Sequence, residues 1–136
     1  MKIGELQIGD WVYESEQTRF PMFITGILKD SDGNGGEVYL DFEGNEGDIW
    51  EVNIEDVRPI PITEDFLANN GFEKHTSYWN ESHNYFKLPD KRFVLLSVMN
   101  GDEILYRIRG MGINIKYIHE LQNAMRMVGI ELEVKI

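Results

Sequence analysis

The stretch Arg58-Pro59-Ile60-Pro61-Ile62-Thr63 divides the chain into two parts that differ in sequence pattern and in charge. Short apolar runs and many glycines precede it, and helix-containing sequence follows it. Residues 1–60 contain four Lys/Arg and fourteen Asp/Glu, a net charge of −10, whereas residues 61–136 contain nine and ten, a net charge of −1. We therefore predict two domains, 1–60 and 61–136, with almost all of the formal charge of −11 in the first.

Length and composition indicate a globular protein. The 136 residues are 42% apolar and 12% aromatic, which is enough for a core, but each part alone is close to the lower limit for an independent one. We therefore expect the two parts to pack on each other. The absence of cysteine excludes disulfides, Cys-metal sites and a thiol nucleophile. No apolar run fits a signal peptide or a membrane span, so the expected location is the cytoplasm.

The acidic balance limits the partners. A pI near 4.6 opposes binding to a phosphate backbone, which depends on Lys and Arg, so direct binding to nucleic acid is not expected. Basic partners or cations fit this charge better.

The first part has the pattern of a small antiparallel barrel. Four alternating apolar runs are joined by turn residues at Asp32–Gly36 and 43–48, where Gly and Asn tolerate a positive φ; the runs are Gly9–Tyr13, Met22–Leu28, Val38–Phe42 and Ile49–Asn53. The order of a Gly-Asp-x-Val segment, hairpins and Ile54-Glu55-Asp56-Val57-Arg58-Pro59-Ile60 resembles the SH3-like barrels over residues 4–62. The resemblance implies a fold and no function.

The second part mixes strands and helices. Thr63 is the expected cap of a short helix that stops at Asn70-Gly71, and residues 84–109 predict a meander with turns at Pro89-Asp90 and Asn100-Gly101-Asp102. Asn114 is the expected cap of the longest helix, 115–128, and alternation from Leu132 to Ile136 predicts a last strand. The predicted fold class is α+β, an N-terminal SH3-like small β-barrel packed on a C-terminal antiparallel sheet with one long helix.

Three segments together carry a second resemblance. They are Gly9-Asp10-Trp11-Val12, residues 54–72 and residues 117–136. The chain resembles, from end to end, a family of small uncharacterised proteins from prophages and mobile elements of gut anaerobic bacteria. The resemblance implies a biological setting and supplies no catalytic residues.

One loop matches part of a calcium-binding pattern. Asp30-Ser31-Asp32-Gly33-Asn34-Gly35 has oxygen ligands at positions 1, 3 and 5 and glycine at position 6, and position 12 is Asp41. Its flanks read as strands, and Asp and Gly are ordinary hairpin residues. We favour a plain turn and keep Asp30, Asp32, Asn34 and Asp41 as a weak candidate metal site.

The motifs of known enzyme classes are missing. His119-Glu120-Leu121-Gln122-Asn123 has Asn where a zinc-protease helix needs its second His, and His75 and His83 fall in a predicted loop region. No nucleophile elbow, phosphate loop or dinucleotide fingerprint is present. We expect no cofactor, no catalytic residues and no enzymatic activity.

The aromatic residues of the acidic part suggest a peptide site. A barrel core takes only some of its seven rings, and exposed rings beside carboxylates attract Lys and Arg side chains. The hypothesis is that Trp11, Tyr13 and Trp50 bind a basic or Pro-containing peptide. The alternative is that the rings form core and the charges are only solvated.

The helix 115–128 suggests a contact surface. Its buried stripe centres between Leu121 and Met125, which leaves His119, Asn123 and Arg126 with Lys116 and Glu120 on a solvated arc. Met127 falls on the same arc, and Met is adaptable at contact surfaces. We therefore predict an interface of Met127, His119, Asn123 and Arg126 with the first part or with another copy of the chain. The oligomeric state cannot be read from the sequence.

These patterns favour a non-enzymatic protein-interaction module of a prophage or mobile element, with a protein or basic peptide as partner. One alternative is a nucleic-acid-associated protein, either a regulator that uses the less acidic second part or an acidic mimic that occupies a nucleic-acid-binding protein. The other alternative is an enzyme without a recognisable motif.

Overall fold

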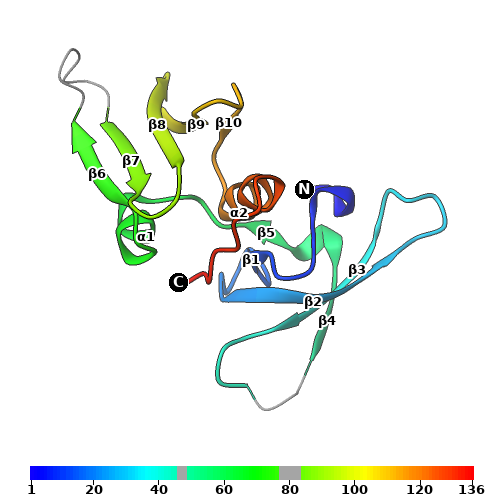
Figure 1. Ribbon diagram of the computed structural model, residues 1–136. Coiled ribbons are helices and arrows are strands. Elements are labelled where there is room, and N and C mark those ends of the chain that lie inside the picture. Colours follow the sequence, from blue (N-terminus) through cyan, green and yellow to red (C-terminus); the bar gives the residue numbers. More distant parts are fainter. Residues whose placement is uncertain (46–48, 77–83) are drawn as a thin grey trace. The chain divides into compact units, whose positions relative to one another are not determined.

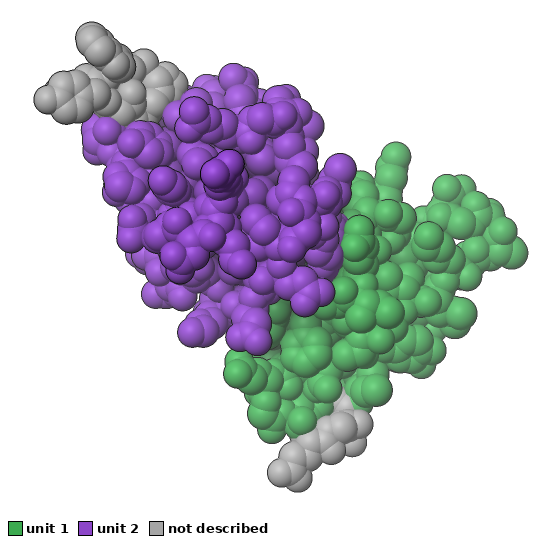
Figure 2. Space-filling view, viewed as in Figure 1, with its two compact units in different colours: residues 1–60 green, residues 61–136 purple. Residues whose placement is uncertain are grey.

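The computed structural model describes residues 1–45, 49–76 and 84–136, so part of the predicted turn at 43–48 and His83 lie outside the described residues. The chain forms two compact units, Met1–Ile60 and Pro61–Ile136, shown in separate colours in Figure 2. The described residues are mostly β, with two antiparallel sheets and two short α-helices (Figure 1). Each sheet lies within one unit.

The first unit is built on a five-stranded sheet with the order β4-β3-β2-β1-β5. Its strands are β1 (Trp11–Tyr13), β2 (Pro21–Lys29), β3 (Gly36–Asp41), β4 (Trp50–Asn53) and β5 (Arg58–Pro59). Two 3-10 turns, η1 (Ile3–Glu5) and η2 (Ile54–Asp56), precede β1 and β5. The β2–β3 register shifts between Ile24 and Gly26, and such a bulge bends and twists a sheet.

One face of this sheet forms the core of the first unit. Alternate residues of β2 and β3 are buried, as a strand with one covered face requires. The core consists of Ile3, Leu6, Val12, Met22, Ile24, Val38, Leu40, Ile54 and Val57. The Gly9-Asp10 turn is tied to β2, because Gly9 N donates to Ile24 O (2.7 Å) and Ile24 N donates to Asp10 O (2.9 Å). The Asp10 side chain is buried and accepts a hydrogen bond from Gln7 N (2.8 Å).

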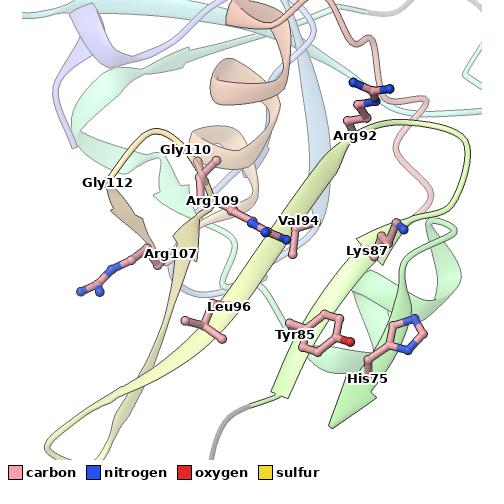
Figure 3. Close-up of a pocket in the computed structure, with 11 residues that line it drawn as sticks. His75, Tyr85, Lys87, Arg92, Val94, Leu96, Arg107, Arg109, Gly110 and Gly112 are labelled. Carbon is pink, nitrogen blue, oxygen red and sulfur yellow. The ribbon is translucent and has the colours of Figure 1, made fainter. Parts of the chain in front are cut away.

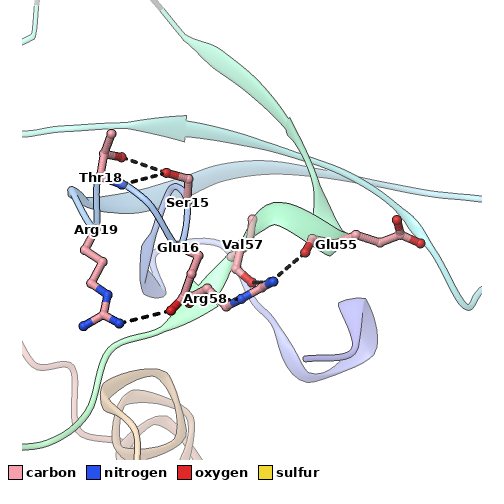
Figure 4. Close-up of polar contacts among 7 residues, drawn as sticks. All are labelled: Ser15, Glu16, Thr18, Arg19, Glu55, Val57 and Arg58. Carbon is pink, nitrogen blue, oxygen red and sulfur yellow. Dashed lines mark hydrogen bonds and ion pairs between the residues drawn. The ribbon is translucent and has the colours of Figure 1, made fainter.

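Arg58 fixes the end of the first unit (Figure 4). Its Nη1 donates to the carbonyl oxygens of Glu55 (2.6 Å) and Val57 (3.0 Å), and its Nε lies 3.3 Å from Glu16 Oε2. The other oxygen of Glu16 accepts from Arg19 Nη2 at 3.0 Å. Two of the four basic residues of this unit are therefore paired with one carboxylate.

The second unit contains a sheet with the order β10-β9-β8-β7-β6 and two helices. Their bounds are α1 (Glu64–Asn69), β6 (Glu73–Thr76), β7 (Asn84–Leu88), β8 (Phe93–Asn100), β9 (Glu103–Ile108), β10 (Asn114–Ile115) and α2 (Ile118–Met127). The cap at Thr63 is confirmed, because its Oγ1 accepts from Phe66 N (3.1 Å). The turn at Asn100-Gly101-Asp102 is confirmed by the pairing of Asn100 with Glu103.

The long helix is shorter than predicted. Asn114 and Ile115 pair with Arg107 and Tyr106 as strand β10, so α2 begins only at Ile118, with Tyr117 as its N-cap. Strand pairing thus places in β10 the residues that helical periodicity had assigned to the start of the helix. Leu121 and Met125 are buried as predicted, but His119 is only 2% exposed, where a solvated position was predicted.

One strand prediction and one loop prediction for the second unit were wrong. Residues 131–136 form no strand; instead the side chain of Asn70 holds this segment, donating to Lys135 O (2.8 Å) and accepting from Lys135 N (2.7 Å). His75 lies in β6, paired with Tyr85, and not in a loop. None of the described helices is long and apolar enough to cross a bilayer.

Candidate functional site

The two faces of the β6–β10 sheet differ in chemistry. One face is buried and carries apolar side chains, among them Phe86, Phe93, Leu95, Tyr106 and Ile108. Because successive side chains of a strand point to opposite faces, the residues between them belong to the other face. Direct pairing aligns these residues in a row across four strands, His75–Tyr85–Leu96–Arg107.

A second row lies one strand period away. Lys87 pairs with Val94, and Arg109 N donates to Val94 O at 3.0 Å, so Lys87, Val94 and Arg109 are neighbours across β7, β8 and the end of β9. The two rows share one face, since Tyr85 and Lys87, like Arg107 and Arg109, are two residues apart.

A groove of about 960 Å³ lies over this face (Figure 3). We call it the basic groove, because Lys87, Arg92, Arg107 and Arg109 line it and no Asp or Glu of the described part of the chain does. The remaining lining residues are His75, Tyr85, Val94, Leu96, Ile108, Gly110 and Gly112. In Figure 3, Arg109 extends over β8 beside Val94, whereas Arg107 extends toward the outer side of β9.

The floor of the basic groove consists of aromatic and aliphatic side chains. Tyr85, Val94 and Leu96 are half-buried and sit on neighbouring strands. The rings of His75 and Tyr85 are stacked, with centroids 5.1 Å apart and planes 15° from parallel. This surface offers two aromatic rings and aliphatic carbon beside cationic side chains.

The cations of the basic groove differ from others in the same unit. Lys74 pairs with Glu64 (3.0 Å) and Lys116 with Glu103 (2.6 Å), and the bond to Glu103 raises the pKa of Lys116. Among the described residues, no carboxylate forms an ion pair with the four cations that line the groove.

Two polar contacts border the groove. Arg107 Nε donates to Asn114 Oδ1 at 3.0 Å, which fixes its guanidinium at the β10 side. Glu73 is opposite Lys87 in the register and lies 3.6 Å from His75 Nε2 through its Oε2. The carboxylate of Glu73 is therefore directed to His75 and not to Lys87.

A smaller hollow of about 410 Å³ adjoins the basic groove. It shares Arg92, Ile108 and Arg109 with the groove and adds Lys91, Asp90 and apolar residues that include Met111 and Ile130. The smaller hollow thus extends the cationic surface beyond the face of the β6–β10 sheet.

The structure does not bring Trp11, Tyr13 and Trp50 together. Trp50 pairs with the buried Leu40, so its side chain lies on the core side of the sheet. Trp11 pairs with Phe23, and Phe23 pairs with Asp41, so these side chains lie on the opposite side. Tyr13 is two residues from Trp11 and shares its face. Trp11 packs edge-to-face on Phe23, with ring centroids 5.3 Å apart.

Trp50 belongs instead to a partly exposed aromatic cluster. Phe42 contacts Phe20 (5.5 Å) and Trp50 (6.1 Å), measured between ring centroids. Phe20 is 45% and Trp50 44% exposed, while Phe42 packs against the core. Phe42, which also contacts Phe20, is thus the aromatic neighbour of Trp50.

The candidate calcium residues do not form one ligand set. Asp30 and Asp32 lie in the β2–β3 turn, where Asp32 Oδ1 accepts from Asn34 N (3.0 Å). Asp41 is the last residue of β3, about 17 Å away at the ordinary rise of a strand, and it accepts from Phe42 N and Asn45 Nδ2. Among the described residues, no group of three or more His, Asp or Glu side chains is placed to hold a metal ion.

The predicted interface residues on α2 differ in how far they are exposed to solvent. Met127 is 76% exposed, and Asn123 and Arg126 are half-buried and joined by a 2.6 Å hydrogen bond from Arg126 Nη1 to Asn123 Oδ1. His119 is buried and stacks on Tyr117, with centroids 6.0 Å apart. A contact of Met127 with another copy of the chain stays a prediction.

Sequence reasoning missed the residues of the basic groove. Tyr85 and Lys87, like Arg107 and Arg109, alternate with apolar residues in the sequence, but only the strand register places the two pairs on one surface. Comparisons of the chain with protein-family models, with curated proteins and with solved structures found no match.

Proposed function

We propose that the protein is a non-enzymatic binding module whose second unit binds an anionic partner in the basic groove. One observation carries the proposal: among the described residues of 61–136, four of the nine Lys/Arg line this groove and none of the nine Asp/Glu does. Random placement of nearly equal numbers of charges would mix the signs. The segregation favours a ligand that supplies the missing negative charge.

The net charge of the chain does not decide this local question. Exposed charges farther apart than about 8 Å are largely screened at physiological ionic strength. Attraction is therefore set by the groups that line the groove, three of which are arginines, and by close neighbours such as Glu73. Arginine binds carboxylate and phosphate through two parallel hydrogen bonds, so both anion types fit the lining.

Heparin is a suitable polyanionic probe. We expect measurable binding of labelled heparin by fluorescence anisotropy, weakened roughly five- to thirty-fold in the double variant Arg107→Gln/Arg109→Gln, because two exposed charge contacts contribute about 1–2 kcal/mol. The matched control is Lys29→Gln/Lys135→Gln, which removes the same charge from exposed residues outside the groove. Equal weakening in both double variants would refute a localised site.

A second candidate is the binding of a basic peptide by the first unit. The exposed rings of Phe20 and Trp50 favour it, because this unit carries a net charge of −10 and rings beside carboxylates attract cations. Titration with basic and acidic peptides, followed by tryptophan fluorescence, tests it. A saturable response to basic peptides that is reduced in Phe20→Ala is the expected result, and a response to acidic peptides alone contradicts it.

The first unit is proposed to be an SH3-like barrel. Its bent five-stranded sheet and the 3-10 turn η2 before the last strand support this assignment. The prophage or mobile-element setting and the cytoplasmic location stay predictions, the first resting on the resemblance of three segments.

A further inference from the structure

We infer that the anionic partner of the basic groove is single-stranded nucleic acid, an inference that rests on the proposed function. The groove combines two features that this ligand needs together. Exposed bases stack on aromatic side chains, and phosphates pair with Lys and Arg beside them. Here the stacked rings of His75 and Tyr85 lie in the floor, and Lys87, Arg107 and Arg109 border it.

The order of the side chains across the sheet matches this chemistry. The first row runs from the His75–Tyr85 stack over Leu96 to Arg107, so a ring surface and an aliphatic surface precede a guanidinium. The second row places Val94 between Lys87 and Arg109. An extended strand lying across the rows would set bases on the apolar residues and phosphates near the cations on either side.

The alternatives use only part of the groove. An acidic peptide would satisfy the arginines, but it has no flat π surface to cover the His75–Tyr85 stack. A duplex keeps its bases stacked on each other and would leave the apolar floor uncovered. Single-stranded nucleic acid is the anion that uses both the cations and the floor.

The size of the surface favours a polymer over a mononucleotide. The basic groove of about 960 Å³ is already at the upper end of small-molecule pockets, and the adjoining hollow of about 410 Å³ shares Arg92 and Arg109 with it. Besides one carboxylate, that of Asp90, the two hollows are lined by five cations, Lys91 included. Several nucleotides are needed to contact all of them.

Fluorescence anisotropy with a labelled oligothymidylate of about 15 nucleotides tests the inference. We expect saturable binding that is competed by unlabelled oligothymidylate and much more weakly by polyglutamate at equal charge concentration. Tyr85→Ala should weaken oligothymidylate binding roughly five-fold or more and leave heparin binding unchanged, because stacking serves only the bases. Tyr85→Phe keeps the ring and should bind within about two-fold of the original chain.

Tyr85→Leu covers the case in which Tyr85→Ala fails to fold, since it keeps apolar bulk without a ring; circular dichroism checks both variants. If heparin binds but oligothymidylate does not, if polyglutamate competes equally, or if Tyr85→Ala and Tyr85→Leu bind oligothymidylate normally, the inference is wrong while the proposed function stands. A duplex that binds as tightly as the single strand also overturns it. If neither heparin nor oligothymidylate binds, the proposed function fails as well.

Discussion

At the scale of single residues, Gly36 carries the most specific constraint in the first unit. Its φ is +144°, and a Cβ atom there would lie 2.1 Å from Leu28 O and 2.9 Å from Ile3 Cδ1. We expect Gly36→Ala to lower the free energy of unfolding by about 2–4 kcal/mol, measured by urea denaturation, because both the backbone and the packing would be strained. Gly4→Ala is the control, since a Cβ at Gly4 meets nothing within 4 Å. Equal effects of the two substitutions would contradict this account.

Individual residues also show where sequence reasoning stops. Thr63 and Asn70 were predicted because capping depends on near neighbours in the chain. Arg109 was not, because its neighbour Val94 is fifteen positions away and meets it only through strand pairing. His119 was misplaced for a similar reason: the helix wheel gives a direction around the axis, but burial depends on what surrounds the helix.

At the scale of elements, the start of α2 depends on Glu120. Its Oε1 accepts from the backbone N atoms of Lys116 and Tyr117, both at 3.0 Å. We expect Glu120→Ala to lower the free energy of unfolding by about 1 kcal/mol, whereas Glu120→Gln keeps most of it, since an amide oxygen can accept the same bonds. The exposed Glu133 is a control site for loss of charge. If Glu120→Gln destabilises as much as Glu120→Ala, charge matters and capping does not.

The β3–β4 pair gives a pH dependence. A side-chain hydrogen bond with Glu51, repulsion from Glu51, burial and repulsion from Asp30 together raise the pKa of Glu37 above its ordinary value of 4.5. Because the folded state holds this proton more tightly, the stability contribution is present at low pH and is lost as the pH rises through the raised pKa. Glu37→Gln removes the repulsion, so its melting temperature should exceed that of the original chain at pH 7.

The gain in Glu37→Gln should disappear near pH 4, where the original carboxyl is protonated. Glu43→Gln, in the exposed turn after β3, is the matched control for loss of one carboxylate and should show a smaller change with pH. A melting-temperature difference for Glu37→Gln that is the same at both pH values would contradict the assignment.

Secondary-structure elements were predicted correctly where several local sequence signals agree. The predictions failed where pairing with a distant strand determines the structure. The β8–β9 hairpin follows from alternation around a Gly turn, and the structure has it. Residues 132–136 alternate as well, yet Asn70 binds Lys135 in place of a neighbouring strand. Strand β6 contains Glu73, Lys74 and His75, and such a polar sequence does not predict a strand. These residues form one because they pair with Lys87, Phe86 and Tyr85 of β7.

At the scale of the whole molecule, the separation of charge along the chain was evident from the sequence, but its consequence was not. A net charge of −11 disfavours an anionic ligand only as an average over the whole surface. The fold gathers Lys87, Arg92, Arg107 and Arg109 in one groove from β7, from the turn before β8 and from β9 and the residue after it. This arrangement depends on the strand register, which cannot be derived from the amino-acid composition.

The location of anion binding is the central claim, and amide chemical-shift mapping by NMR tests it most directly. Oligothymidylate and heparin are titrated separately into the isotopically labelled full chain. The account predicts that the largest shifts occur at Tyr85, Lys87, Val94, Leu96 and Arg107–Arg109, with residues 1–60 nearly unchanged. Shifts centred in residues 1–60 or on α2, or no shifts with either ligand, would contradict it.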